Sequence, residues 1–190
     1  MKFTAKITHS GKTVTAMSLA QYNVFSFKKK VAIMVAALAL ILLSIITAGG
    51  PPSVVSLFLG CWLLVCTNLP ARQMARATER ALKGKYPTFI YYFEEKQIVI
   101  LVDGKRQVLE FSDIYSFAED KRAFYLFVNE LSSFMVPKAS LDPCSEDDFR
   151  SYISALSGKR CKNVRRLVGI NLRTIIQDLR SFRSDEPYHL

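Results

Sequence analysis

The sequence predicts a membrane protein in which a two-helix transmembrane hairpin precedes a cytoplasmic α+β domain of antiparallel strands closed by a helix. Three observations predict this fold class. Residues 31–71 contain no Asp, Glu, Lys or Arg, and basic residues flank that stretch on both sides. Residues 86–157 alternate short runs of β-branched and aromatic residues with polar turns. One part of the chain therefore suits lipid and the other suits water.

The first segment, residues 1–27, is predicted to be a short cytoplasmic arm. Its beginning alternates apolar Phe3, Ala5 and Ile7 with polar residues, which is the pattern of a half-buried strand. We therefore expect this arm to supply one strand to the sheet of the later domain. Residues 1–15 would then be needed for the stability of that domain.

The hairpin is predicted within residues 28–70, with spans at about 31–47 and 53–69. Each span makes about 25 Å of helix at ~1.5 Å per residue, which is short but adequate for a bilayer. The connection at 48–52 contains two Gly and two Pro, which interrupt the helix and return the chain. A signal peptide cleaved near 47–49 is the alternative; the long leader and the second span disfavour it.

Small residues recur four apart in both spans, as Ala32 with Ala36 and as Ser56 with Gly60. Such spacing lets two helices approach closely in a membrane. Packing within the hairpin is the favoured interpretation, and a dimer interface is the alternative.

Basic residues flank the hairpin and set its predicted orientation. They are Lys28, Lys29 and Lys30 before it, and Arg72, Arg76, Arg80 and Lys83 in the basic juxtamembrane linker 71–85 after it. The positive-inside rule places both termini in the cytoplasm. These bases are also candidate contacts for anionic lipid headgroups, although a topology signal alone is the favoured interpretation.

The net charge of +10 is unevenly distributed. Residues 1–30 carry +6 and residues 72–85 carry +4, whereas residues 86–157 carry −5 and residues 158–190 carry +5. The folded domain is thus acidic, which argues against a nucleic-acid-binding surface.

Residues 86–157 are predicted to fold as one domain. Polar turns, of which Asp103-Gly104 is the strongest, separate six short runs of strand-forming residues. The predicted strands cover 88–94, 98–102, 106–111, 114–119, 123–128 and 133–137. Their short connections predict an antiparallel meander.

A helix follows these strands. Ser145 is a candidate N-cap, and Glu146, Asp147 and Asp148 suit the positive end of a helix dipole better than a metal site. Phe149, Ile153 and Leu156 are predicted to share one face of this helix, and Gly158 is a natural C-terminal stop. Strands closed by such a helix resemble a pleckstrin-homology-like (PH-like) fold, whose usual seventh strand the N-terminal arm would supply.

Most of the chain, up to about Lys159, resembles the YcxB-like family of bacterial membrane proteins. The resemblance is carried by Phe111-Ser112-Asp113-Ile114, by Phe124-Tyr125-Leu126-Phe127 and by Val136-Pro137-Lys138, together with the order of arm, two spans and PH-like domain. It implies a multi-pass protein of the bacterial inner membrane, and it implies no defined activity.

The tail, residues 158–190, has apolar residues at helical spacing with Arg residues between them. It is predicted to form a basic amphipathic helix that lies on the membrane, docks a partner or packs on the domain. The candidate contact face consists of Leu167, Leu172, Ile175, Ile176, Leu179 and Phe182.

No catalytic, metal or cofactor motif is found in the sequence, so we expect no enzyme and no cofactor. Lys138 follows Pro137 and is interpreted as a solvated loop residue, with phosphate binding as the alternative.

The expected function is therefore a membrane-anchored, non-enzymatic interaction module that presents its domain to a protein partner or to lipid headgroups. The alternative is a small subunit of a membrane pore or transport complex, with Ser44, Ser56 and Thr67 as candidate pore-lining residues.

Overall fold

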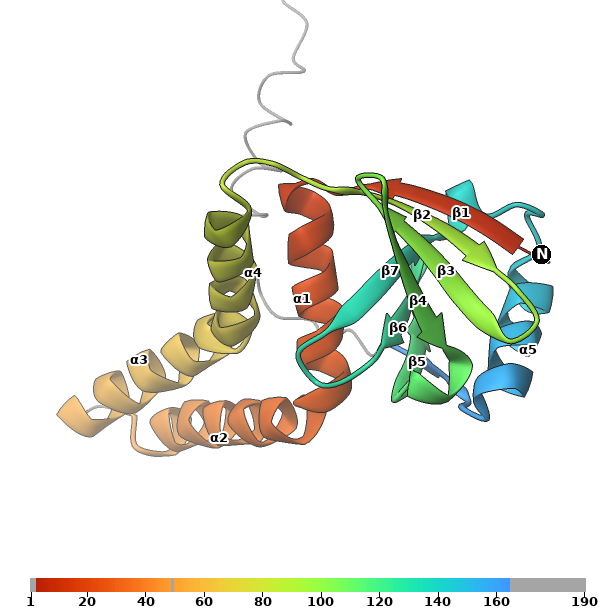
Figure 1. Cartoon of the computed structure of the whole chain (residues 1–190). Coiled ribbons are helices and arrows are strands. Elements are labelled where there is room, and N and C mark those ends of the chain that lie inside the picture. The colour runs from red at the N-terminus through yellow and green to blue at the C-terminus, as the bar shows by residue number, and fades with distance from the viewer. Residues whose placement is uncertain (1–2, 49, 165–190) are drawn as a thin grey trace, which may run out of the picture. The chain divides into compact units, whose positions relative to one another are not determined.

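The computed structural model describes residues 3–48 and 50–164, and this part of the chain divides into two units (Figure 1). Residues 3–27 and 70–164 form the sheet unit, and residues 28–69 form the helical unit. The sheet unit is thus assembled from two separate stretches of sequence, with the helical unit inserted between them.

The first sheet of the sheet unit contains β1 (Phe3–Thr8), β2 (Thr88–Phe93), β3 (Gln97–Val102) and β4 (Lys105–Glu110), in that order and all antiparallel. The alternation of apolar residues places every second side chain of β1 in the core. The N-terminal segment therefore does contribute a strand, which pairs along its whole length with β2.

The second sheet contains β5 (Ser116–Glu119), β6 (Ala123–Phe127), β7 (Ser133–Pro137) and β8 (Cys161–Asn163), in the order β7-β6-β5-β8. A short 3₁₀ turn, η1 (Phe111–Asp113), leads into it from β4. Strand β8 was not expected from the sequence. It runs parallel to β5, and its three residues are too few to give a periodic signal.

Helix α5 (Glu146–Ser157) closes both sheets at one end, as predicted from residues 145–158. The ring of Phe149 lies 5.3 Å from that of Phe3, 4.9 Å from that of Phe93 and 4.9 Å from that of Phe124, measured between centroids. The helix ends at Gly158 in the left-handed conformation, with φ 67°. Leu156, which the spacing places on the same face as Phe149 and Ile153, is 39% exposed, whereas those two residues are fully buried.

Two further helices accompany the sheets, α1 (Gly11–Phe25) and α4 (Leu69–Leu82). Ser10 begins α1 with a capping box in which Ser10 and Thr13 each bond the other's backbone N–H. The start of α1 lies against the end of α4, because a Cβ on Gly11 would be 2.9 Å from a carboxylate oxygen of Glu79. The predicted linker 71–85 is therefore largely helical.

The helical unit contains α3 (Pro51–Cys66) and most of α2 (Phe27–Ile46). Among the described residues, α2 is the one helix that is by itself long and apolar enough to cross a membrane. Helices α3 and α4 reach that length only together, and they are bent by 41° at the break between them. Pro51 and Pro52 occupy the first turn of α3, where proline fits.

Helices α2 and α3 approach each other most closely at Gly60. A Cβ at this position would lie 2.7 Å from Cγ1 of Ile41 and 2.9 Å from the carbonyl oxygen of Ala37, so no larger residue fits without movement. Ser56 and Gly60 are buried, as the small-residue spacing predicted. Ala32 and Ala36 are exposed, so Ala37 replaces that pair at the contact.

Candidate functional site

Helix α4 carries three of the predicted basic residues. Ala71 and Ala75 are buried against the sheet unit, while Arg76 and Arg80 are exposed and lie four residues apart on one helix face. Arg72 is half-buried and already interacts with other groups. Lys83 follows the helix and is exposed. The structure therefore leaves Arg76, Arg80 and Lys83 available to an anionic partner.

The three lysines at the start of α2 differ from one another. Lys28 and Lys29 are exposed, whereas Lys30 is 1% exposed and its Nζ donates to Oδ1 of Asn68 at 2.9 Å. Lys30 is thus removed from the predicted set of headgroup contacts. It ties the beginning of α2 to the residues that follow α3.

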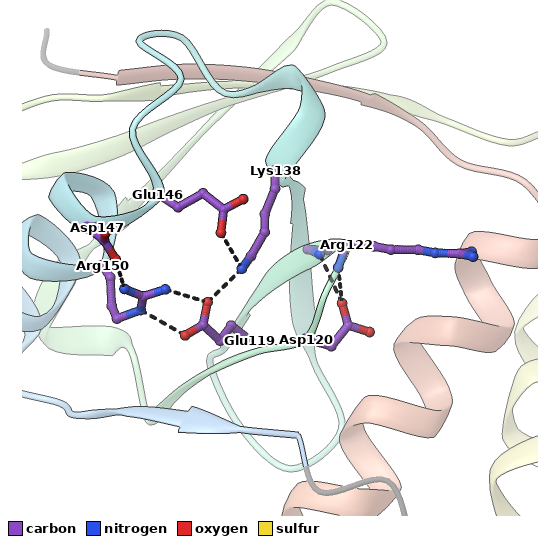
Figure 2. Close-up of polar contacts among 8 residues, drawn as sticks. Glu119, Asp120, Arg122, Lys138, Glu146, Asp147 and Arg150 are labelled. Carbon is purple, nitrogen blue, oxygen red and sulfur yellow. Dashed lines mark hydrogen bonds and ion pairs between the residues drawn. The ribbon is translucent and has the colours of Figure 1, made fainter.

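A charge network, defined here as Glu119, Lys138, Glu146, Asp147 and Arg150, joins β5 to α5 (Figure 2). Glu119 ends β5 and accepts hydrogen bonds from Nζ of Lys138 at 2.8 Å and from Nε and Nη2 of Arg150 at 2.8 and 3.0 Å. The two bases extend the network outward, since Lys138 also pairs with Glu146 at 2.6 Å and Arg150 pairs with Asp147.

The network stabilises Glu119 in its charged form. Burial alone would raise the pKa of this carboxyl group, but the hydrogen bonds and positive charges of Arg150 and Lys138 outweigh burial and lower the pKa below its usual value. Burial likewise opposes the charge of Lys138, and hydrogen bonds to Glu119 and Glu146 raise its pKa instead. Neither group is poised to exchange a proton near neutral pH.

Cys161 lies beside this network. Burial, followed by the nearby negative charge of Glu119, raises the pKa of its thiol to about 12. Because the thiolate is the reactive form of cysteine, this thiol is a poor nucleophile and a poor metal ligand. In the described part of the chain, no three His, Cys, Asp or Glu side chains lie close enough to hold a metal ion.

The network corrects the interpretation of Lys138. Its side chain is 12% exposed and its Nζ lies 4.7 Å from the ring centre of Phe124, so it is neither a solvated loop residue nor a free phosphate ligand. Glu146 and Asp147 also do more than favour the helix start. No local sequence pattern could reveal these contacts, because Glu119 precedes Lys138 by 19 residues and Arg150 by 31.

Two further sets of predicted residues are the contact face of the tail and the candidate pore-lining residues. The candidate contact face of the tail, from Leu167 to Phe182, lies outside the described residues. The candidate pore-lining residues are described. Ser44, Ser56 and Thr67 are all buried, and the last two donate hydrogen bonds to carbonyl groups of their own helix.

Comparison with protein families supports the resemblance. Residues 93–153 match the family described as YcxB-like protein, so the resemblance inferred from the sequence is confirmed over this segment. The matched segment begins at the end of β2 and ends within α5, and it includes all five residues of the charge network. The comparisons found no matching curated protein and no matching solved structure.

Proposed function

We propose that this chain is a membrane-anchored, non-enzymatic interaction module. Helices α2 and α3 cross the bacterial inner membrane as a hairpin, and the sheet unit is a PH-like domain held at the cytoplasmic face. The domain presents its surface to a protein partner or to anionic lipid headgroups. One observation carries the proposal, namely the distribution of side chains over the helical unit.

The helical unit exposes its large apolar side chains and buries its small ones. Leu42, Ile46, Phe58 and Trp62 are exposed by more than half of their area. The buried positions are taken by Ala37, Ser44, Ser56, Gly60 and Thr67. In water such an apolar surface would be strongly unfavourable, whereas lipid is the solvent that suits it, and helix pairs in membranes pack through small residues.

The position of the helical unit in the sequence, between the two stretches that form the sheet unit, argues against a cleaved signal peptide. Cleavage near residues 47–49 would remove β1, which pairs with β2 along six residues, and would also remove α1 from the sheet unit. A retained anchor keeps the sheet complete.

The arrangement of strands supports the PH-like assignment. Seven of the described strands form antiparallel ladders in two sheets, and α5 follows the last of these strands and closes both sheets. The lone departure is β8, which comes after α5 and runs parallel to β5.

The exposed bases support cytoplasmic placement of both flanks. Lys28 and Lys29 precede the first span and Arg76, Arg80 and Lys83 follow the second, which is the charge bias of cytoplasmic segments. The same bases would attract anionic headgroups by about 1 kcal/mol each near the surface. The pore alternative is disfavoured, because Ser56 and Thr67 are buried and bonded within their own helix.

Topology is tested by cysteine labelling in native membranes. Cys144 is exposed on the sheet unit, so a variant that keeps only this cysteine should react with a membrane-impermeant maleimide in inside-out vesicles and not in intact spheroplasts. An Ala48→Cys variant without the native cysteines should behave in the opposite way. Labelling of Cys144 from outside would overturn the cytoplasmic placement, and release of the chain by alkaline carbonate would overturn the anchor.

Partner binding is tested by copurification of the full chain in mild detergent. An Arg76→Glu/Arg80→Glu variant should lose an anionic partner or lipid, whereas Arg106→Glu, an exposed base on β4, should retain it. Equal recovery with both variants would show that the basic face of α4 is not the contact.

A further inference from the structure

The sheet unit contains a cavity of about 750 Å³. Its walls come from α1 and α4 on one side and from β2, β3, β4, β7 and the loop before β7 on the other. All of these lining residues belong to the sheet unit. The volume lies within the range of pockets that hold small molecules, roughly 300–1,000 Å³.

The cavity wall is largely apolar and adaptable. The apolar lining residues are Met17, Met74, Phe89, Val102, Leu131 and Phe134. The two methionines face the cavity from α1 and α4, respectively, and methionine side chains adjust to ligands of irregular shape. This lining suits a flexible hydrocarbon chain better than a rigid polar metabolite.

The polar residues of the cavity supply one uncommitted positive charge. Asp103, in the β3–β4 turn, also lines the cavity, but its carboxylate accepts a hydrogen bond at 3.1 Å from the backbone N–H of Thr88 in β2. Lys105 begins β4 and is exposed, and it forms no ion pair with any residue that the structure describes. Gln107 lies two residues further along the same face of β4 and also lines the cavity. An ammonium group beside an amide at the margin of an apolar cavity is complementary to a carboxylate.

We propose that this cavity binds a long-chain fatty acid, with the hydrocarbon chain between Met17 and Met74 and the carboxylate beside Lys105. This goes beyond the proposed interaction module, since it assigns a ligand site within the domain. Only the source of the ligand rests on that proposed function. An amphiphile from the bilayer is the natural occupant, because the proposed anchor keeps the domain at a membrane.

The test uses the full chain in lipid nanodiscs with a photoreactive palmitate that carries a diazirine in its alkyl chain. Irradiation followed by peptide mass spectrometry should find adducts on the peptides that contain Met17, Met74 or Phe134. Excess oleate should suppress these adducts. Adducts confined to α2 and α3 would overturn the proposal, because the bilayer alone would produce them.

Two pairs of variants test the geometry. Met74→Trp fills the cavity and should reduce adducts within it about tenfold, while Gln73→Trp adds the same bulk to an exposed position of α4 and should not. Lys105→Glu should weaken labelling by palmitate about tenfold but leave labelling by a photoreactive hexadecanol unchanged. Its control is Arg106→Glu, the exposed neighbour on β4, which should alter neither label.

The outcomes separate the site from the anchor. The thermal unfolding midpoint of each variant must match that of the parent chain, and Met74→Phe or Lys105→Gln, which removes the charge without reversing it, replaces a variant that fails. Equal labelling of Met74→Trp and Gln73→Trp overturns the cavity site. If the topology experiment fails while the cavity is still labelled, the site stands and only the bilayer source of the ligand is lost.

Discussion

The helical unit and the sheet unit follow opposite packing rules within one chain. In the sheet unit, large rings such as Phe117, Phe124 and Phe149 are fully buried, and the exposed faces of α5 and β4 carry charges. In the helical unit, glycine, alanine and serine occupy the contact, and large apolar residues such as Phe58 face outward. The sheet unit is stabilised by large side chains packed in its core, and the helical unit is stabilised by the close approach of two helix backbones.

This difference is the one expected if, as proposed above, lipid surrounds the helical unit and water surrounds the sheet unit. In water, burial of apolar area provides the main driving force for folding. Between two helices in lipid that force is absent, so packing and hydrogen bonds decide the contact. The same substitution should therefore have different effects in the two units. The chain provides separate probes, because its one tryptophan, Trp62, lies in α3, whereas residues 28–69 contain none of its tyrosines.

The largest expected difference is between two leucines truncated to alanine. Leu126 in β6 is buried, and Leu126→Ala should lower the free energy of unfolding of the sheet unit by about 2–5 kcal/mol through loss of apolar area and formation of a cavity. Leu42 on α2 is exposed, and Leu42→Ala should change stability by no more than about 0.5 kcal/mol.

Denaturant unfolding, followed by tyrosine near-ultraviolet circular dichroism for the first variant and by Trp62 fluorescence for the second, measures both changes. A Leu42→Ala effect as large as that of Leu126→Ala would break the comparison, since it would show that the outer face of α2 is packed against protein.

The second effect concerns the charge network of the sheet unit. Glu119→Gln should cost about 3 kcal/mol at neutral pH, because Lys138 and Arg150 would lose their carboxylate while remaining partly buried. Asp147→Asn is the control, since that side chain is 90% exposed and its ion pair with Arg150 should contribute little.

The same carboxyl group predicts a pH dependence. The pKa of Glu119 is lower in the folded protein than in the unfolded chain, so its contribution is fully present above the ordinary glutamate pKa of about 4.3 and is lost as the pH falls below it. In the parent chain, the free energy of unfolding measured near pH 4 and below should therefore be lower than at neutral pH. If Glu119→Gln loses stability on acidification as steeply as the parent does, the assignment is contradicted.

The smallest expected effect is in the helical unit. Gly60→Ala adds a single carbon that would lie 2.9 Å from the carbonyl oxygen of Ala37, and it should destabilise the contact between α2 and α3 by about 1–3 kcal/mol. Ala36→Leu adds more volume at an exposed position of α2 and should be nearly neutral. Thermal unfolding in detergent, read from Trp62 fluorescence, tests the pair. Equal midpoints for the two variants would argue against this helix contact.

The sequence predicted those elements whose residues carry a local signal. The strands fall within about two residues of their expected positions, because turns such as Asp103-Gly104 separate them and both of these residues adopt positive φ. Helix α5 was recognised from its start, its apolar spacing and Gly158. Leu156 shows the limit of this reasoning, since spacing identifies a helix face and not how far the neighbouring sheet extends.

Helix α1 was missed because half of its buried residues are polar. Ser18, Gln21 and Asn23 are buried there, and the side-chain amide of Gln21 donates to the backbone carbonyl of Glu130, a partner 109 residues away. No apolar periodicity marks such a helix. The charge network and the cavity were missed because each is assembled from residues that only the folded chain brings together.

The pairing of β1 with β2 has a consequence for the order of biogenesis. Thr8 pairs with Thr88, and the two residues are separated by 80 positions, with the entire helical unit between them. During synthesis β1 leaves the ribosome first and has no partner until the hairpin has been made. Closure of a loop this long is slow for a free chain. A hairpin already inserted by the translocation machinery would place β2 on the same side of the membrane as β1. The sheet would then be completed only in chains whose hairpin has inserted. A chain that fails to insert would keep an unpaired strand edge exposed to proteases.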